Sequence, residues 1–197
     1  MREMMKMVVV LTLISAFSGG LLAAVKNSTE ERIEIQKLEY VKGPVIRKIF
    51  EGATNDPIKD RFKIEKEGKG YSLFAGVFDG KAEAVALEAF GKGFGGNIGV
   101  IVGVDIKSDK IIGVGVTNHN ETPGLGARAS SDAAFAGQFK GRPLTETFKV
   151  RADGGQVDAL SGATFTSRGV ADAITTAGKL YKEMKPQIEQ KLKSVSK

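Results

Sequence analysis

The sequence predicts an α+β protein: a single N-terminal transmembrane helix, then one mixed or antiparallel sheet domain with flanking helices. Three observations support this. An uncharged stretch lies near the N-terminus, apolar residues alternate with a period of two between residues 70 and 117, and a long apolar stripe at helical spacing follows residue 164. Because the strand patterns come before the helix patterns, this class is favoured over a parallel doubly wound sheet.

The composition limits the kinds of site that the chain can hold. Its 197 residues suit one well-cored domain with an accessory element. The absence of cysteine excludes disulfides, iron–sulfur clusters and thiolate metal sites, so any redox chemistry must come from a cofactor. His119 is the single histidine, and we expect no metal site. Much of the net charge of +6 lies in the C-terminal tail. The sequence has no stripe of basic residues with interleaved aromatics, so it does not predict nucleic-acid binding.

The N-terminal stretch predicts a membrane anchor. Residues 7–25 carry no charge, and at about 1.5 Å per residue they nearly match a hydrocarbon core of about 30 Å. Arg2 and Lys6 precede this stretch, so the positive-inside rule places the N-terminus in the cytoplasm and the rest outside. We therefore expect a single-pass protein of the cytoplasmic membrane with an extracytoplasmic domain. The alternative is a signal peptide cleaved near Val25.

Four regions follow from these patterns: an anchor at 1–27, a stalk helix with a connecting segment at 28–69, a globular domain at 70–185, and a basic tail at 186–197. In the stalk, Ser28 and Glu31 form a capping-box pattern that predicts a helix start, and Gly43-Pro44 predicts its end. The charged residues 51–69 are expected to form a loop that enters the domain.

The globular region begins with two predicted strand pairs. Residues 70–77 and 82–90 alternate in hydrophobicity and are joined by Asp79-Gly80, which predicts a hairpin. Residues 98–106 form the clearest strand, and residues 111–117 its return. Glycines recur on one face of this second pair, which indicates that a helix, another backbone or a planar ligand packs very close there.

Two helices and a short strand are expected in the C-terminal half. Ser130-Ser131-Asp132 predicts the cap of a short helix, and Thr145 to Arg151 a short strand. The long last helix is expected to be capped by Thr166 or Ser167 and to end at Pro186. Its apolar stripe consists of Val170, Ala173, Ile174, Ala177, Leu180, Tyr181 and Met184.

The strongest candidate site is the run Asp158-Ala159-Leu160-Ser161-Gly162-Ala163-Thr164, where a strand-like segment gives way to this helix. Gly162 and Ala163 remove side-chain bulk beside Thr164, so a large group can approach its hydroxyl. The helix start favours an anion there, and Arg168 offers a charged donor. The residues alone leave open a simple turn with Thr164 upstream of the helix cap.

A second candidate loop runs from His119 to Gly126. Pro123 fixes one backbone angle, while Gly124 and Gly126 permit positive φ and close approach to a ligand. A structural turn with Glu121 in a salt bridge is the alternative. The Gly91–Gly96 loop lacks the spacing of a dinucleotide-binding loop and is expected to connect strands.

The run Asp158–Thr164 resembles the flavinylation signature of the FMN-binding domain family, shared by the G subunit of the Rnf electron-transport complex and the C subunit of the sodium-pumping NADH:quinone reductase. Glu121–Gly126 resembles the second signature of that family, and the anchor follows its layout. The resemblance, which spans Gly70 to Leu180, makes residues 70–185 an FMN-binding domain. It implies FMN joined by a phosphoester to Thr164.

Further site residues are implied by the same resemblance. Glu121 or Thr122 would hydrogen-bond the flavin, Leu125 would lie on its ring, and His119 would be a neighbour or an ordinary surface residue. The implied cofactor-binding residues are Glu121, Thr122, Gly124, Leu125, Ser161, Gly162 and Ala163. A dedicated flavin transferase, which takes FMN from FAD, would recognise Asp158, Ser161, Gly162, Ala163 and Thr164.

By resemblance, the chain is an electron-relay subunit of a membrane-bound, ion-translocating ferredoxin:NAD oxidoreductase complex of the Rnf type. It would act with other membrane subunits and not as a stand-alone enzyme. The length of the chain fits the G subunit better than the longer C subunit of the quinone reductase, which is one alternative. The other is an anchored, non-redox module that binds an anion or a phosphate.

Overall fold

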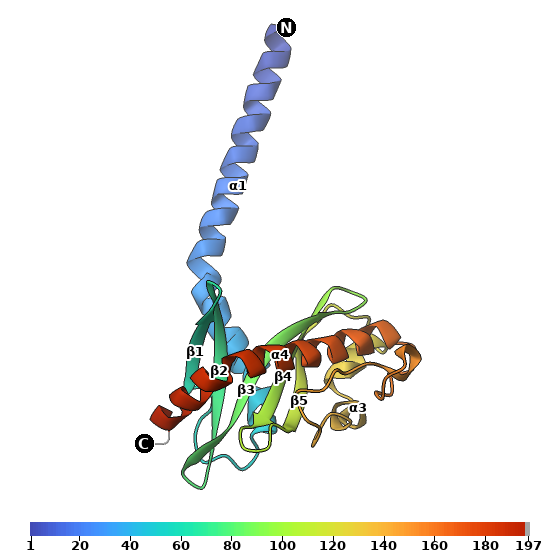
Figure 1. Ribbon diagram of the computed structural model, residues 1–197. Coiled ribbons are helices and arrows are strands. Elements are labelled where there is room, and N and C mark those ends of the chain that lie inside the picture. Colours follow the sequence, from blue (N-terminus) through green and yellow to red (C-terminus); the bar gives the residue numbers. More distant parts are fainter. Residues whose placement is uncertain (196–197) are drawn as a thin grey trace. The chain divides into compact units, whose positions relative to one another are not determined.

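The computed structural model describes residues 1–195 of the chain (Figure 1). Lys197, the last lysine of the tail, and the side chain of Glu31, from the predicted capping box, lie outside the described residues. Two compact units, Met1–Tyr40 and Val41–Lys197, divide the chain.

The first unit is one long helix, α1 (Arg2–Gln36), which runs into the π-helical segment η1 (Lys37–Lys42). Its part from Arg2 to Glu30 is long and apolar enough to cross a membrane, in agreement with the predicted anchor. The predicted helix start at Ser28 is wrong, because α1 passes through this residue without a break. The Ser28 hydroxyl instead donates a hydrogen bond to the Val25 carbonyl oxygen at 2.9 Å, inside the helix.

The second unit opens with helix α2 (Gly43–Ile49), where the sequence predicted a helix end. That prediction is wrong because Pro44 lies in the first turn of α2. A first-turn residue has no intrahelical acceptor for its N–H, so proline loses nothing there, and its fixed φ suits a helix start.

A five-stranded antiparallel sheet forms the centre of this unit. Its strands lie side by side in chain order: β1 (Arg61–Lys66), β2 (Lys69–Phe78), β3 (Lys81–Lys92), β4 (Asn97–Asp105) and β5 (Ile111–Asn118). Both predicted strand pairs and the α+β class are confirmed. The turn between β2 and β3 uses positive φ at Asp79 and Gly80, as its sequence indicates. Strand β1 was missed, because its residues were assigned to a charged loop.

One face of the sheet is covered by the last helix, α4 (Thr164–Val195), which crosses it in Figure 1. Alternate residues of β4, from Ile98 to Val104, belong to the same apolar core as Ile174 and Tyr181 of α4. These side chains are almost wholly removed from solvent. Their burial provides the main free energy that holds α4 on the sheet.

The glycine-rich face carries α2. A Cβ atom added to Gly103 would overlap the Ile49 side chain, and one added to Gly115 would overlap Val45. A Cβ on Gly76 would lie 2.9 Å from the ring of Phe50, the residue after α2. Of the three possibilities that the glycines left open, a closely packed helix is therefore the correct one.

Two C-terminal elements agree only in part with the sequence. Helix α3 (Ala133–Gly137) is capped as expected: the Asp132 side chain accepts a hydrogen bond from the Phe135 N–H at 2.9 Å. No strand forms from Thr145 to Arg151 in the described structure, apart from an isolated bridge between Val150 and Val157. The Phe148 N–H donates instead to the Thr175 hydroxyl at 2.9 Å, so its partner is a side chain of α4 and not a strand.

Helix α4 is longer at both ends than its pattern predicted. It begins at Thr164, ahead of Thr166 and Ser167, and it continues past Pro186 to Val195. The predicted end at Pro186 is wrong, because Ile188 and Leu192 extend the apolar stripe and are both buried in the core. Their burial outweighs the single hydrogen bond that the proline removes.

Candidate functional site

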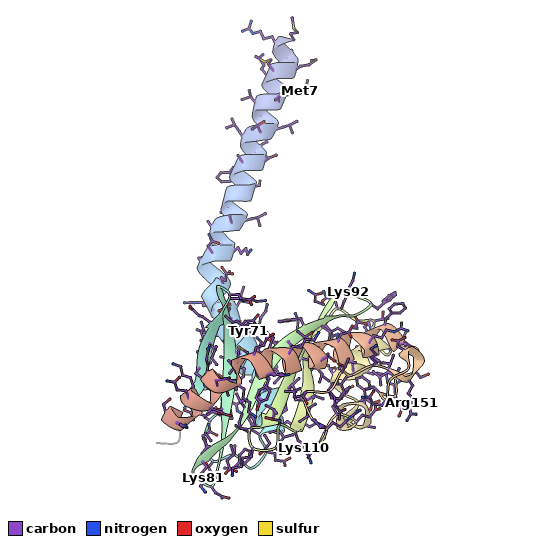
Figure 2. All side chains as sticks on the ribbon, in the orientation of Figure 1. Met7, Tyr71, Lys81, Lys92, Lys110 and Arg151 are labelled. Carbon is purple, nitrogen blue, oxygen red and sulfur yellow. The ribbon has the colours of Figure 1, made fainter. Side chains whose placement is uncertain are left out.

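The two candidate loops meet at the N-terminal end of α4. The first, residues 158–164, leads directly into this helix, and the second, residues 119–126, follows β5. A Cβ on Gly162 would lie 3.2 Å from a methyl carbon of Leu125, so the loops touch through these two residues. In Figure 2, Lys92 at the end of β3 and Arg151 ahead of the first loop lie around this end of the helix. The structure thus gathers residues that are distant in sequence.

A buried carboxylate ties the site together. Glu121 is only 6% exposed. Its Oε1 accepts a hydrogen bond from the Gly95 N–H at 2.8 Å, and its Oε2 accepts one from the Thr166 hydroxyl. The backbone N–H of Glu121 also donates to His119 Nδ1 at 3.3 Å. One side chain therefore connects the 93–96 loop, the 119–126 loop and the first turn of α4.

Close backbone approaches fix the same region. Gly126 lies against Glu121 and Thr166, since a Cβ there would overlap the Thr166 hydroxyl and lie 2.6 Å from Glu121 Oε2. A Cβ on Gly91 of β3 would overlap the Gly169 carbonyl oxygen of α4, so helix and strand cross in backbone contact at these glycines. No side chain larger than hydrogen fits at these points.

Thr164 is the first residue of α4 and is half-buried. Within the described residues its hydroxyl makes no hydrogen bond. The first N–H groups of a helix have no intrahelical acceptor and favour a nearby anion. Thr164 therefore offers an accessible hydroxyl beside a set of unused backbone donors.

The turn before Thr164 is held by Ser167, which is fully buried. Its hydroxyl accepts a hydrogen bond from the Leu160 N–H and donates one to the Ala163 carbonyl oxygen, both at 3.0 Å. Gly162 has a φ of +74°, which requires glycine for a relaxed backbone. Ser161 and Gly162 are exposed, while Ala163 is buried beneath the turn.

Other predicted residues have more peripheral places. Thr122, Pro123 and Gly124 form an exposed turn, with a φ of +75° at Gly124. Asp158 is exposed and forms an ion pair with Arg151. These positions leave Thr122 and Asp158 open to solvent and therefore to a binding partner.

Arg168 forms an ion pair with a neighbouring carboxylate, that of Asp153. Its guanidinium donates two hydrogen bonds to Asp153, at 2.6 and 2.7 Å. These hydrogen bonds lower the pKa of Asp153 and raise that of Arg168. The guanidinium also lies over the ring of Phe165, 5.2 Å from its centroid.

Sequence patterns did not identify two aromatic side chains at the site. Phe94, in the loop between β3 and β4, is 74% exposed, and Phe165, the second residue of α4, is 61% exposed. Their ring centroids are 6.5 Å apart. Leu125 is also exposed nearby. One signal in the sequence could have indicated Phe94: it is a large apolar residue among glycines in the 91–96 loop, where no buried position was expected.

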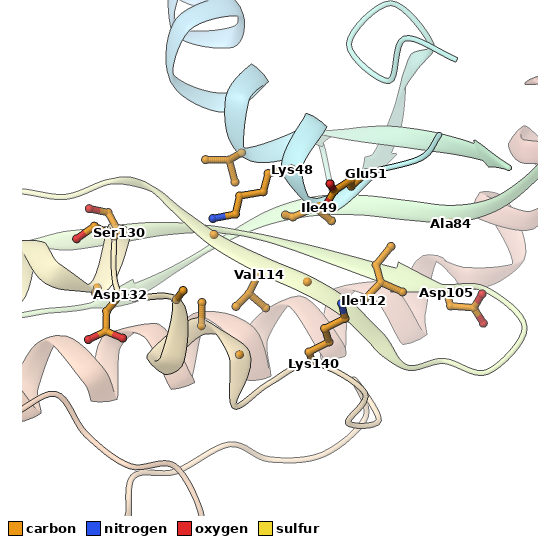
Figure 3. Close-up of a pocket in the computed structure, with 18 of the residues that line it drawn as sticks. Lys48, Ile49, Glu51, Ala84, Asp105, Ile112, Val114, Ser130, Asp132 and Lys140 are labelled. Atoms are coloured by element: carbon orange, nitrogen blue, oxygen red, sulfur yellow. The ribbon is translucent and has the colours of Figure 1, made fainter. Parts of the chain in front are cut away.

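A large cleft of the second unit lies elsewhere (Figure 3). It measures about 780 Å³ and is bordered by α2, β5 and the segment around α3, with Lys48 and Lys140 among its lining residues. Two further clefts, of about 460 and 420 Å³, lie near Phe50 and near Tyr71. Residues of the two candidate loops line none of these three clefts. The candidate site therefore lies outside these three clefts.

Comparison with known proteins gives a consistent family. Residues 93–179 match the family described as the FMN-binding domain. The G subunit of the ion-translocating oxidoreductase complex from Methanosarcina acetivorans is 31% identical over 178 residues, which cover 89% of this chain and 93% of the relative. The G subunit of the proton-translocating ferredoxin:NAD(+) oxidoreductase complex from Clostridium ljungdahlii is 31% identical, and the match covers 85% of each chain.

Solved structures agree on the fold. The C subunit of the Na(+)-translocating NADH-quinone reductase from Parabacteroides distasonis is 27% identical with a TM-score of 0.51, over 64% of this chain and 74% of that one. NqrC from Shewanella oneidensis is 26% identical with a TM-score of 0.53, over 71% and 72% of the two chains.

Proposed function

Since the chain belongs to the family of G subunits of ion-translocating oxidoreductase complexes, which carry the FMN-binding domain, we propose that it is the electron-relay subunit of an Rnf-type complex and holds FMN through a phosphoester to Thr164. The observation that carries the proposal is the unpartnered Thr164 hydroxyl at the N-terminal end of α4. The other membrane subunits of the complex would be its partners.

The residues at the site fit FMN. A phosphate on Thr164 would be next to the free N–H groups of the first turn of α4, where a negative charge is stabilised. Gly162 leaves room beside the hydroxyl, and Phe94, Leu125 and Phe165 offer an apolar surface for a flat ring. Glu121 has both carboxylate oxygens hydrogen-bonded within the protein. We therefore propose that it positions the loops around the flavin.

A covalent bond would suit a site that lies outside the described clefts. A ligand of this size normally requires a pocket that buries most of its surface, and the described clefts lie away from Thr164. A tether keeps the cofactor at the site without such a pocket. An extracytoplasmic protein would otherwise lose a diffusible FMN to dilution.

The attachment reaction follows from the chemistry of the hydroxyl. The Thr164 oxygen would attack the phosphorus of FAD on the flavin side. The phosphoanhydride bond breaks, AMP leaves, and the hydroxyl proton passes to a base. Ser161, Gly162 and Asp158 are exposed around Thr164, so a flavin transferase could bind the segment Asp158–Thr164 directly.

Once bound, FMN supplies one- and two-electron redox chemistry. The chain fixes the point of attachment, because Ser167, Glu121 and the contact between Gly91 and Gly169 hold the start of α4 in place. We also propose that α1 anchors the chain in the cytoplasmic membrane, with its N-terminus in the cytoplasm and the FMN-binding domain on the other side.

The test is production of the protein together with a flavin transferase, in wild-type and Thr164→Val forms. The wild-type chain should carry the mass of FMN on the peptide that contains Thr164 and should fluoresce in a denaturing gel. Thr164→Val should lose both signals and keep its circular dichroism spectrum. Thr176→Val, at an exposed position of the same helix, is the matched control and should keep its flavin. An unmodified wild-type peptide, or flavin retained on Thr164→Val, would contradict the proposal.

A further inference from the structure

Phe94 and Phe165 are large apolar side chains that the fold leaves in solvent. They lie far apart in sequence, yet their rings are 6.5 Å apart at an interplanar angle of 54°. This separation is within the range of favourable aromatic pairs. Because both rings are mostly exposed, little of their apolar surface is removed from water, and they contribute little to the stability of the domain. Exposed apolar clusters of this kind commonly mark a binding site.

Both rings are mounted on rigid supports. The loop of Phe94 is closed by a hydrogen bond from the Gly93 N–H to the Gly96 carbonyl oxygen at 2.8 Å, and Gly95 is bonded to Glu121. Phe165 belongs to the first turn of α4, and one face of its ring lies under the Arg168 guanidinium. Asp153 holds that guanidinium by two hydrogen bonds.

The cation–π contact favours one orientation of the Phe165 ring. Arg168 thus supports Phe165 from one side and leaves the rest of the ring accessible. Phe165 also follows Thr164 directly in the chain, so any group attached to the threonine hydroxyl is within reach of it.

We propose that Phe165, supported by Arg168, and Phe94 together form the surface on which the isoalloxazine of the Thr164-linked FMN rests. This inference depends on the proposed function, because it takes the attachment at Thr164 as given. Neither phenylalanine belongs to the two signature runs. In this role they contact the ring directly, fix it against the protein and shield one of its sides from water.

The chain contains no tryptophan, which allows a direct test. An indole in van der Waals contact with an excited flavin quenches its fluorescence by donating an electron, and this quenching falls steeply with distance. The variants Phe94→Trp and Phe165→Trp are made with the flavin transferase. The flavin fluorescence of each native protein is divided by the value after denaturation, which corrects for flavin content.

Phe94→Trp and Phe165→Trp should each lower this ratio severalfold relative to wild type. Phe78→Trp is the control, because Phe78 is far from the proposed flavin site. It pairs with Lys81 at one end of β3, whereas Lys92, next to the loop of Phe94, is at the other end. At about 3.3 Å per residue that strand separates the two ends by roughly 35 Å, so the control ratio should equal that of wild type. Phe165→Ala should increase quenching of the flavin by iodide, and Phe165→Leu should do so less.

The outcomes separate this inference from the proposed function. A wild-type chain without flavin would overturn both. Flavin present on every variant, with the same native-to-denatured ratio in Phe94→Trp, Phe165→Trp and Phe78→Trp, would overturn the ring placement and leave the attachment intact. If Phe165→Ala does not fold, the iodide measurement on Phe165→Leu and Phe94→Ala decides, and unchanged quenching counts against the proposal.

Discussion

The Thr166 hydroxyl, in the first turn of α4, donates a hydrogen bond to the carboxylate of Glu121, 45 residues earlier in the chain. Both side chains are buried, at 2% and 6% exposure. Glu121 was expected to face a ligand or a salt-bridge partner. The structure shows its carboxylate facing inward, where it joins the second signature loop to the helix that begins at Thr164.

Thr166→Val should destabilise the domain by about 1 to 3 kcal/mol, because a buried carboxylate oxygen loses its donor while the shape of the side chain is kept. Urea unfolding followed by circular dichroism measures this free energy. Thr176→Val, on the exposed side of the same helix, should change stability by no more than about 0.5 kcal/mol. Equal effects of the two substitutions would show that the buried hydrogen bond contributes nothing.

Gly126→Ala should disturb the site more than its single methyl group suggests. The added carbon would overlap the Thr166 hydroxyl and press on Glu121, so we expect a loss of about 1 to 3 kcal/mol and lower flavin incorporation. Gly137→Ala is the control, since a Cβ there meets nothing within 4 Å. Unfolding midpoints and flavin content per chain check both variants, and a neutral Gly126→Ala would contradict the packing described above.

A polar cluster at the turn between β4 and β5 should make stability depend on pH. Burial alone would raise the pKa of Asp109, but hydrogen bonds from Lys185 and Tyr181 outweigh it, so the pKa falls below the ordinary value of 3.8. The same burial and the bond to Asp109 raise the pKa of Tyr181. A lowered carboxyl pKa stabilises the fold above the unfolded-state pKa, and this contribution is lost as the pH falls through the folded-state value.

Asp109→Asn tests this cluster. The positive φ of 55° at this position suits asparagine, so the backbone should be unchanged. The variant should be less stable than wild type at about pH 7, and the difference should shrink as the pH is lowered past 3.8 and the wild-type carboxylate takes up its proton. A series of urea titrations across this pH range measures the difference. Asp79→Asn, at an exposed turn, is the control. A difference that grows toward low pH would contradict the assignment.

The proposed orientation of α1 can be read by cysteine labelling, because the chain has no cysteine of its own. A membrane-impermeant maleimide should label Lys81→Cys, at the exposed first residue of β3, in cells whose cytoplasmic membrane is intact. Glu3→Cys should be labelled only after lysis. The reverse pattern would contradict the orientation, and an intact mass that begins near Val25 would show that the anchor is cleaved as a signal peptide.

Much of the fold could be predicted because local patterns agreed with tertiary packing. Alternation in β2 to β4 and the stripe of α4 are core-facing patterns, and the structure buries most of the residues concerned. Strand β1 was missed because Arg61, Lys63 and Glu65 dominate its composition, although Phe62 and Ile64 alternate with them. The charges face solvent at the edge of the sheet, where they also hinder unwanted pairing.

The remaining errors came from local signals that tertiary contacts override. Pro186 predicted a helix end, but burial of Ile188 and Leu192 keeps α4 going. At the site, the two signature loops were predicted to work together, and they do meet. The exposed pair Phe94 and Phe165 could not be predicted, since a contact between residues this distant in sequence leaves no period or spacing to detect.

The crossing of β3 and α4 at Gly91 and Gly169 has a mechanical consequence. No side chain separates the two backbones at this crossing, so α4 cannot rotate about its own axis relative to β3 without a clash. If FMN is attached to Thr164 as proposed, its point of attachment would not move, and only the phosphate and the sugar chain would allow the flavin ring to change position. A change in the electron-transfer distance to the next redox centre would then require a movement of the cofactor or of the neighbouring subunit of the complex.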